Sequence, residues 1–303
     1  MKYIDKLNTP NARQGVMKTQ QFIDDCWENG SYNNLTYEHY KNDSGFTDIL
    51  VKDQVDNRSE RAFCCYCMRV LAVNGDSVNH PKNVTLEHII PHHISEKEWN
   101  DNNNEIQRKY QKYTNLDSKH VNVCFGGDLP NPKTQITSEP HPHFISYRNL
   151  VVSCDGKILE GEEVVPSHCC NNMRGNLYVE PLYLKSDVDS LIKYDSKGCL
   201  DFDDDVIDYE WFDNSHLNLS APGLNKIRRL WYLVSRTNYT PADVCSAETN
   251  TVLKKEILDK AIVGTTSPWA NFYNNKSVWN LFSEYSWFYD YYRAHYPLTN
   301  TPA

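Results

Sequence analysis

The chain has 303 residues, with 31 Lys and Arg against 40 Asp and Glu and a formal net charge of -9. This length is enough for one large domain or two ordinary ones, and 40% hydrophobic residues can supply an apolar core. No window approaches the roughly 18 uninterrupted apolar residues that a membrane span requires, so a transmembrane protein is excluded. An acidic chain is also a poor nonspecific binder of nucleic acid unless its basic residues cluster or a partner supplies positive charge.

The ten cysteines are too sparse and too unevenly spaced to predict a disulfide framework. The first residues are charged and lack an apolar signal segment, so we expect a cytoplasmic protein with no membrane partner. In that reducing compartment, cysteines favour a metal-binding or catalytic role.

The N-terminal region, residues 1–60, is predicted to be helical. Apolar residues share one helix face between about Arg13 and Trp27, and Asn29-Gly30-Ser31 ends the pattern. The composition then changes abruptly at Phe63-Cys64-Cys65-Tyr66-Cys67. This change marks the start of a second region, residues 61–185.

A long insertion is predicted inside the second region, over about residues 95–146, where the chain is rich in Asn, Lys and Pro and has little periodicity. The third region, residues 186–303, opens with two short apolar runs on either side of Asp195-Ser196-Lys197-Gly198, a pattern typical of a hairpin. Helices are predicted from about Pro222 and from Thr251, followed by an aromatic-rich stretch.

A zinc site is predicted from the cysteine spacing. Cys64 and Cys67 have the two-residue gap that lets one tight turn present two thiolates to a tetrahedral zinc ion. Cys154 and one of Cys169 or Cys170 can complete a four-thiolate site, and we select Cys170. Such a site holds together a region with few apolar residues of its own, which is the usual role of structural zinc.

A carboxylate and an imidazole lie side by side in Leu86-Glu87-His88-Ile89-Ile90-Pro91, which predicts a short apolar strand. An acid and a histidine at a strand end can divide the work of hydrolysis. The carboxylate binds a divalent metal, and the neutral imidazole accepts a proton from water. Taken alone, a Glu-His pair is common and carries little information.

The order Cys64-x-x-Cys67, Glu87-His88, Asn149 to Cys154 and Cys170-Asn171 resembles the HNH endonuclease superfamily, and more closely its PtuB-like branch in Septu and retron anti-phage defence operons. The resemblance covers roughly residues 1–236. It implies an α+β fold, in which a zinc-stapled ββα-metal (HNH) core carries mainly α-helical N- and C-terminal flanks.

The resemblance also implies roles for individual residues. His88 would be the general base that deprotonates the attacking water, and Asn149 would orient His88. Asn171 and Glu87 would hold a catalytic divalent ion, and oxygen-rich ligands of this kind suit Mg²⁺ or Mn²⁺. Apart from the resemblance, Arg174 is expected either to contact the substrate phosphate or to pair with Glu180 at the surface.

Several ligand assignments stay open at this point. The link between Cys154 and Cys170 is longer than in compact HNH sites, so Cys169 or His168 remains an alternative zinc ligand. A second, poorer Asn-to-Cys pattern makes Asn115 and Cys124 rival assignments, and Asn172 is a rival to Asn171.

The implied activity is hydrolysis of phosphodiester bonds in DNA or RNA during anti-phage defence. The implied partners are a nucleic acid substrate, an ATPase of the PtuA-like kind and a retron complex that contains RNA and DNA. The competing hypothesis is a non-catalytic zinc-binding adaptor that docks a partner through its aromatic C-terminus. Residues 237–303 match no family that we can name.

Overall fold

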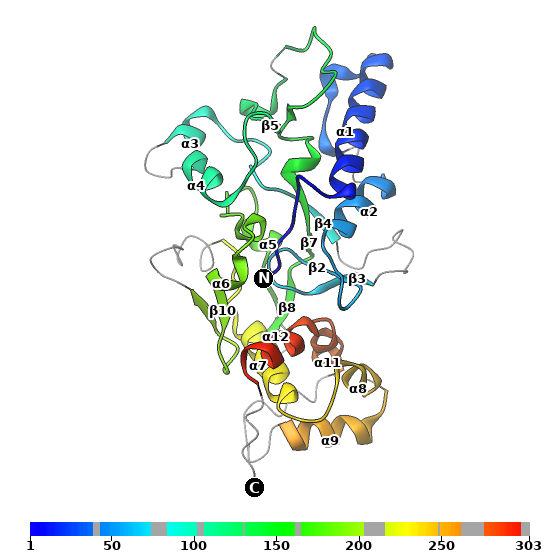
Figure 1. Cartoon of the computed structure of the whole chain (residues 1–303), viewed down its shortest axis with the longest axis vertical. Helices are drawn as coiled ribbons and strands as arrows, with labels where there is room; N and C mark the ends of the chain where they lie inside the picture. The colour runs from blue at the N-terminus through cyan, green and yellow to red at the C-terminus, as the bar shows by residue number, and fades with distance from the viewer. Residues whose placement is uncertain are drawn as a thin grey trace.

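The computed structural model describes residues 1–38, 43–73, 84–101, 106–129, 131–160, 165–202, 216–247, 249–261 and 276–297. Helices and short strands are mixed along the chain, as expected for the α+β class (Figure 1). The sheets of the described residues have two or three strands each, in the orders β1-β2-β3, β4-β7, β5-β6, β8-β9 and β10-β11. No helix in these ranges is both long enough and apolar enough to cross a membrane.

The helices and strands have the following bounds. The α-helices are α1 (Pro10–Glu28), α2 (Ser44–Asp53), α3 (Glu96–Asn100), α4 (Ile106–Tyr113), α5 (Asn171–Arg174), α6 (Val188–Leu191), α7 (Pro222–Ser235), α8 (Pro241–Ser246), α9 (Thr251–Ala261), α11 (Lys276–Ser283) and α12 (Trp287–His295). The 3-10 helices are η1 (Tyr32–Asn34), η3 (Phe125–Gly127), η4 (Tyr147–Asn149) and η5 (Leu182–Leu184). The strands are β1 (Val55–Asp56), β2 (Arg61–Phe63), β3 (Val70–Val73), β4 (Val84–His88), β5 (Val121–Asn122), β6 (His141–Pro142), β7 (Leu150–Cys154), β8 (Lys157–Glu160), β9 (Val165–His168), β10 (Ile192–Tyr194) and β11 (Leu200–Phe202).

The predicted N-terminal helix is confirmed as α1, which begins after Thr9. The Thr9 hydroxyl accepts a hydrogen bond from the Ala12 N–H, and Pro10 occupies the first turn, where its missing N–H costs nothing. Helix α1 packs against α2 and η4. At the centre of this contact, Asp53 accepts hydrogen bonds from Lys6 Nζ at 2.9 Å and from the Tyr147 hydroxyl.

The pair β4 and β7 lies at the middle of the molecule (Figure 1). The two strands are antiparallel over five residue pairs, from Val84 opposite Cys154 to His88 opposite Leu150. Every residue of β7 is buried, which explains its apolar sequence. The side chain of Gln54 joins β7 to β2. Its Oε1 accepts a hydrogen bond from the Val152 N–H at 2.9 Å, and its Nε2 donates to the Val152 carbonyl at 2.9 Å and to the Phe63 carbonyl at 2.6 Å.

The segment predicted as an irregular insertion, 95–146, contains α3, α4, β5 and β6. Helix α3 begins with a capping box between Ser95 and Glu98. The insertion also differs from the prediction at its C-terminal end, where residues 141–146 are fully buried. These residues therefore belong to the core that surrounds β4 and β7.

The predicted hairpin and the helix at Pro222 are both confirmed. Strands β10 and β11 pair antiparallel, and Gly198 in their turn has a φ of 83°, a left-handed conformation that favours glycine. Helix α7 buries an apolar face that includes Leu224, Ile227 and Trp231. The aromatic stretch forms two helices, α11 and α12, which gather with α7, α8 and α9 at one end of the molecule (Figure 1).

Replacing Gly15 by Ala is expected to destabilise the protein. A Cβ at this position in α1 would lie 2.1 Å from Tyr147 Cδ2, and the Tyr147 ring is held by its hydrogen bond to Asp53. Overpacking of this kind costs about 1–3 kcal/mol, which outweighs the roughly 1 kcal/mol that Ala gains over Gly in a helix. Urea denaturation measures the difference.

The matched control is Gly45→Ala in α2, where the nearest atom to a new Cβ is the Asp43 carboxylate oxygen at 3.2 Å. Gly45→Ala is expected to be at least as stable as the wild type, whereas Gly15→Ala is expected to be less stable than the wild type. Equal stability of the two variants would contradict the close approach of Tyr147 to α1.

Candidate functional site

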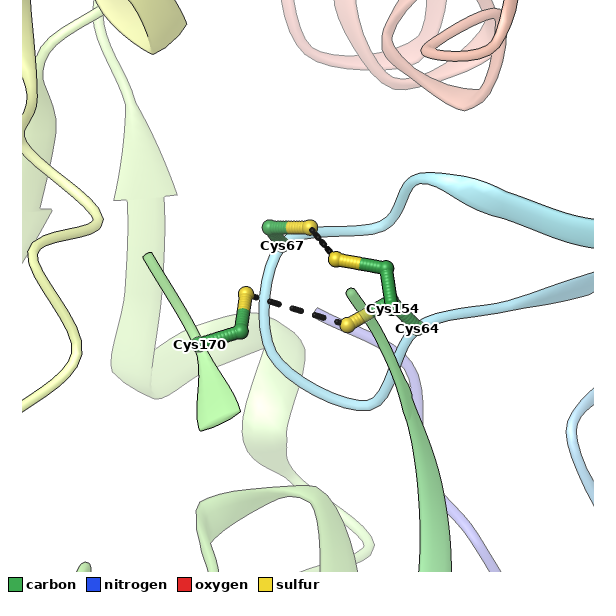
Figure 2. A group of neighbouring side chains, drawn as sticks. All are labelled: Cys64, Cys67, Cys154 and Cys170. Atoms are coloured by element: carbon green, nitrogen blue, oxygen red, sulfur yellow. Dashed lines mark hydrogen bonds between the residues drawn. The ribbon is translucent and has the colours of Figure 1, made fainter. Parts of the chain in front are cut away.

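Four cysteine side chains meet in the interior, and they come from three distant parts of the chain (Figure 2). Cys64 and Cys67 lie in the turn between β2 and β3, Cys154 ends β7, and Cys170 precedes α5. All four are buried, and their sulfur atoms lie within 4.8 Å of one another. The distance is 3.9 Å from Cys64 Sγ to Cys170 Sγ and 3.6 Å from Cys67 Sγ to Cys154 Sγ.

These distances match the edges of a tetrahedral thiolate site. A Zn–S bond of about 2.3 Å in tetrahedral geometry places neighbouring sulfur atoms about 3.8 Å apart. Four thiolates buried together repel one another unless a cation lies between them. The donor set and its spacing therefore fit a metal such as zinc, as the cysteine spacing predicted.

The local backbone explains how each ligand reaches this point. The turn that bears Cys64 and Cys67 is closed by a hydrogen bond of 2.8 Å from the Cys64 N–H to the Arg69 carbonyl. Cys170 adopts a φ of 54°, and its N–H donates to the Leu217 carbonyl at 2.9 Å. This left-handed residue changes the direction of the chain just before α5, which turns the Cys170 side chain into the cluster.

The alternative ligands lie outside the group of four. Cys169 is buried, with its sulfur 3.4 Å from Cys170 Sγ, so it is a fifth thiol beside the cluster. His168 is exposed on β9. Cys124 lies near His143, whose Nδ1 accepts a hydrogen bond from the Cys124 N–H at 3.2 Å. Among the described residues, the structure thus selects Cys170.

His88 ends β4 and is held in one tautomer. Its Nε2 lies 2.9 Å from the Phe144 carbonyl oxygen, and because a carbonyl only accepts hydrogen bonds, Nε2 carries the proton. The other nitrogen, Nδ1, keeps its lone pair. Packing against Tyr37 and His92 partly buries the ring and lowers the pKa of His88 to about 3. The imidazole is therefore neutral at pH 7, the form that a general base requires.

Asn149 is fully buried and binds the backbone of two segments near His88, at Ile90 and at His143. Its Oδ1 accepts from the Ile90 N–H at 2.8 Å, and its Nδ2 donates to the carbonyls of Ile90 and His143, each at 2.9 Å. His143 directly precedes Phe144, whose carbonyl holds the His88 ring. Asn149 thus fixes the two segments that position His88 without contacting the imidazole itself.

Glu87 lies on the opposite side of β4 from His88, since successive residues of a strand alternate between its faces. Its side chain is buried. One carboxylate oxygen is 2.9 Å from an Arg174 nitrogen, and the other accepts from the Ser153 hydroxyl at 3.1 Å. Burial raises the pKa of Glu87 to about 7, while Arg174 and Ser153 lower it. The predicted role of Glu87 as a ligand of the catalytic ion does not fit this arrangement.

Arg174 is also buried, and it uses all five of its N–H groups inside the protein. It donates to Glu87, to the Tyr66 hydroxyl at 3.0 Å and to the Leu177 carbonyl at 2.8 Å. Its remaining two N–H groups bind the carbonyls of His88 and Ile89. Neither predicted role fits, because no donor is left for a phosphate and Glu180 pairs instead with Lys109. Arg174 braces the strand end that carries His88.

The predicted asparagine ligands occupy the start of α5. Asn171 is its first residue and is half-buried next to Cys170. Asn172 is exposed and donates to the Asp155 carbonyl. Asn115 lines a small cavity with residues 3–8. With Glu87 engaged by Arg174, Asn171 alone remains of the predicted ligand set for Mg²⁺ or Mn²⁺, so these residues do not by themselves form a divalent-ion site.

Sequence reasoning missed the contribution of the segment His143-Phe144. The Phe144 carbonyl orients His88, and His143 Nε2 lies 3.1 Å from the Pro91 carbonyl. His92 stacks on His88 with ring centroids 5.3 Å apart. A backbone carbonyl has no signature in the amino-acid sequence, so the pairing of Phe144 with His88 had no signal to find.

Comparisons of the chain with protein-family models, with curated proteins and with solved structures find no match.

Removing one thiolate is expected to abolish metal binding. In Cys64→Ser, a neutral hydroxyl replaces one of the four sulfur donors, and metal sites of this type lose affinity and folding energy together. Atomic emission after dialysis should find zinc in the wild type and little in the variant. Cys199→Ser, which lies outside the cluster, should retain zinc; equal zinc in both variants would rule out the four-cysteine site.

The free energy of unfolding is expected to fall as the pH falls from about 6.5 to 4. Burial lowers the pKa of His88 to about 3 and the pKa values of His92, His141 and His143 to about 4, whereas histidines of the unfolded chain bind protons near pH 6.5. Between these values the unfolded state holds more protons, so acid favours it. Urea denaturation at several pH values measures the slope.

The comparison variant is His143→Gln, in which the amide keeps a donor and an acceptor but does not titrate. Its stability should depend less steeply on pH over this interval. The raised pKa of Glu87 makes the folded state more stable as the pH falls, which opposes the effect of the histidines. Because Glu87 is present in both the wild type and His143→Gln, its contribution cancels in the comparison. An unchanged slope would show that His143 is not held neutral by the fold.

Proposed function

We propose that this chain is an HNH-type nuclease that hydrolyses phosphodiester bonds in DNA or RNA, with His88 as the general base. The observation that supports this function best is the state of His88. Its Nε2 proton is bound by the Phe144 carbonyl, its Nδ1 is unprotonated, and it makes no second hydrogen bond within the described ranges. An imidazole held in one orientation at a strand end has the geometry of a general base, and the hydrogen bond to the Phe144 carbonyl raises its basicity against the burial that lowers it.

The mechanism begins when His88 Nδ1 takes a proton from a water molecule. The resulting hydroxide attacks phosphorus, the bond to the leaving oxygen breaks, and solvent protonates that oxygen. The Phe144 carbonyl stabilises the imidazolium that forms, since it accepts a hydrogen bond from the opposite nitrogen. Asn149 and Arg174 hold the backbone at residues 88–90 and so keep the ring in place.

The surroundings of His88 follow the order that the HNH resemblance implies. Strands β4 and β7 form an antiparallel pair, and α5 follows Cys170. In this proposal the cysteine cluster holds a structural zinc ion that joins the end of β7 to the start of α5. The Mg²⁺ or Mn²⁺ ion of the resemblance is not part of the steps above, because Glu87 is bound to Arg174.

We infer that the nuclease acts with a partner in the cytoplasm. A net charge of -9 opposes binding to a polyanion, so a partner must bring the substrate to His88 or neutralise the repulsion. The resemblance suggests an ATPase of the PtuA-like kind and a retron complex in anti-phage defence.

The second candidate function is a non-catalytic zinc-binding adaptor. The buried pair of Glu87 and Arg174 supports this alternative, since it withdraws the carboxylate that a metal-dependent nuclease would use. An adaptor, however, gains nothing from a histidine fixed in one tautomer. We therefore place the nuclease first.

His88→Ala is expected to abolish cleavage while zinc content stays close to wild type, because the ring contacts Phe144, Tyr37 and His92 and not the four cysteines. Plasmid DNA and a structured RNA serve as substrates, with Mg²⁺ or Mn²⁺ present and with a chelator. His93→Ala is the control, since His93 is an exposed neighbour that lies outside the proposed steps. The adaptor would be favoured if wild type and His88→Ala were equally inactive, also with the ATPase present.

A further inference from the structure

The C-terminal region contacts the cysteine cluster through one tyrosine. Tyr285 lies in the short connection between α11 and α12 and is fully buried. Its hydroxyl oxygen is 3.6 Å from Cys67 Sγ, although the two residues are more than two hundred positions apart in sequence. This contact is not part of the predicted zinc site or of the proposed nuclease steps.

Three further contacts fix the connection against the hairpin of β2 and β3. The Val70 N–H donates to the Glu284 carbonyl at 2.7 Å, and Arg69 Nε donates to the Glu284 carboxylate at 2.6 Å. Arg61 donates to the Ser286 hydroxyl at 2.8 Å. Residues 284–286 are therefore bound to both sides of the turn that bears Cys64 and Cys67.

Arg69 extends the same contact to a third segment. Its guanidinium also pairs with Asp155 at 2.8 Å, and Asp155 directly follows Cys154. One buried arginine thus joins the C-terminal connection, the cysteine turn and the end of β7. These bonds connect the segments that bear Cys67 and Cys154 to residues 284–286.

The chemistry gives the contact a direction. A metal-bound thiolate has no proton and only accepts hydrogen bonds, so the Tyr285 hydroxyl is the donor. A phenol carries its proton at neutral pH and can donate it in a hydrogen bond. Four thiolates around Zn²⁺ leave two net negative charges in a buried place, and a donor to one sulfur disperses part of that charge.

We propose that Tyr285 is an outer hydrogen-bond donor to the Cys67 thiolate, which couples metal binding to the docking of the C-terminal helices α11 and α12. The inference rests on the zinc centre of the proposed function but not on nuclease activity. Coupling is reciprocal: the docked connection strengthens metal binding, and the bound metal stabilises the docked connection.

The variant that isolates the hydrogen bond is Tyr285→Phe, which keeps the ring and removes only the hydroxyl. The control is Tyr292→Phe in α12. Tyr292 is equally buried, and its hydroxyl donates to the Asp195 carbonyl at 3.1 Å, away from the cysteines. Both variants lose one buried hydrogen bond, so a difference between them reports the sulfur contact.

Zinc affinity is measured on the full chain by competition with a chromophoric chelator. Loss of an outer-shell partner typically weakens metal binding about 10- to 100-fold, and we expect at least about 10-fold for Tyr285→Phe and little change for Tyr292→Phe. Co²⁺ replaces zinc for spectroscopy. Without the donor the thiolate is more electron-rich, so the sulfur-to-cobalt charge-transfer band should move to lower energy in Tyr285→Phe alone.

Hydrogen exchange tests the coupling in the other direction. Removing zinc from the wild type should accelerate amide exchange in residues 284–295 more than in α1. Equal affinities and unshifted bands in wild type and Tyr285→Phe would overturn the inference, as would equal losses in both variants. A wild type that binds no metal would overturn the zinc centre with it, whereas inactivity towards nucleic acid would affect the nuclease proposal alone.

Discussion

The sulfur atoms of four cysteines lie close together in the protein interior, and the central part of the fold depends on this cluster. The turn after β2 is also joined to the end of β7 by the bond from Arg69 to Asp155, and to α5 by the bond from Arg174 to the Tyr66 hydroxyl. Mutual repulsion of buried thiolates opposes the arrangement unless a cation is present, and a structural zinc ion contributes on the order of 10 kcal/mol or more to folding. The cluster thereby fixes where β7 ends, and through the pairing of β7 with β4 it fixes the position of His88.

The cysteine cluster was largely predictable because thiolate spacing is a local property. The two-residue gap of Cys64 and Cys67 requires only one tight turn. Cys170 was predicted as the fourth ligand, but the spacing alone left Cys169 as an alternative, since the choice depends on the left-handed backbone at Cys170 and on its bond to Leu217. The hairpin around Gly198 and the start of α7 were predictable for the same local reason.

Contacts between distant residues account for what the sequence did not show. That Glu87 and His88 face opposite sides follows from strand geometry, but the pairing of Glu87 with Arg174 depends on the position of α5. The Asn- and Pro-rich composition of residues 95–146 indicated a long insertion, yet its last residues supply the carbonyl that orients His88. Tyr285 belongs to the aromatic-rich C-terminal stretch, and no local pattern linked it to Cys67.

Strands β4 and β7 also set the distance between the four-cysteine cluster and His88. Cys154 lies opposite Val84 at one end of the pair, and His88 lies opposite Leu150 at the other. An added or deleted residue in either strand would shift the register, which reverses the faces of all residues beyond it. This part of the chain therefore tolerates substitution more readily than a change in length. Insertions that preserve both the cysteine cluster and the position of His88 must fall outside the two strands.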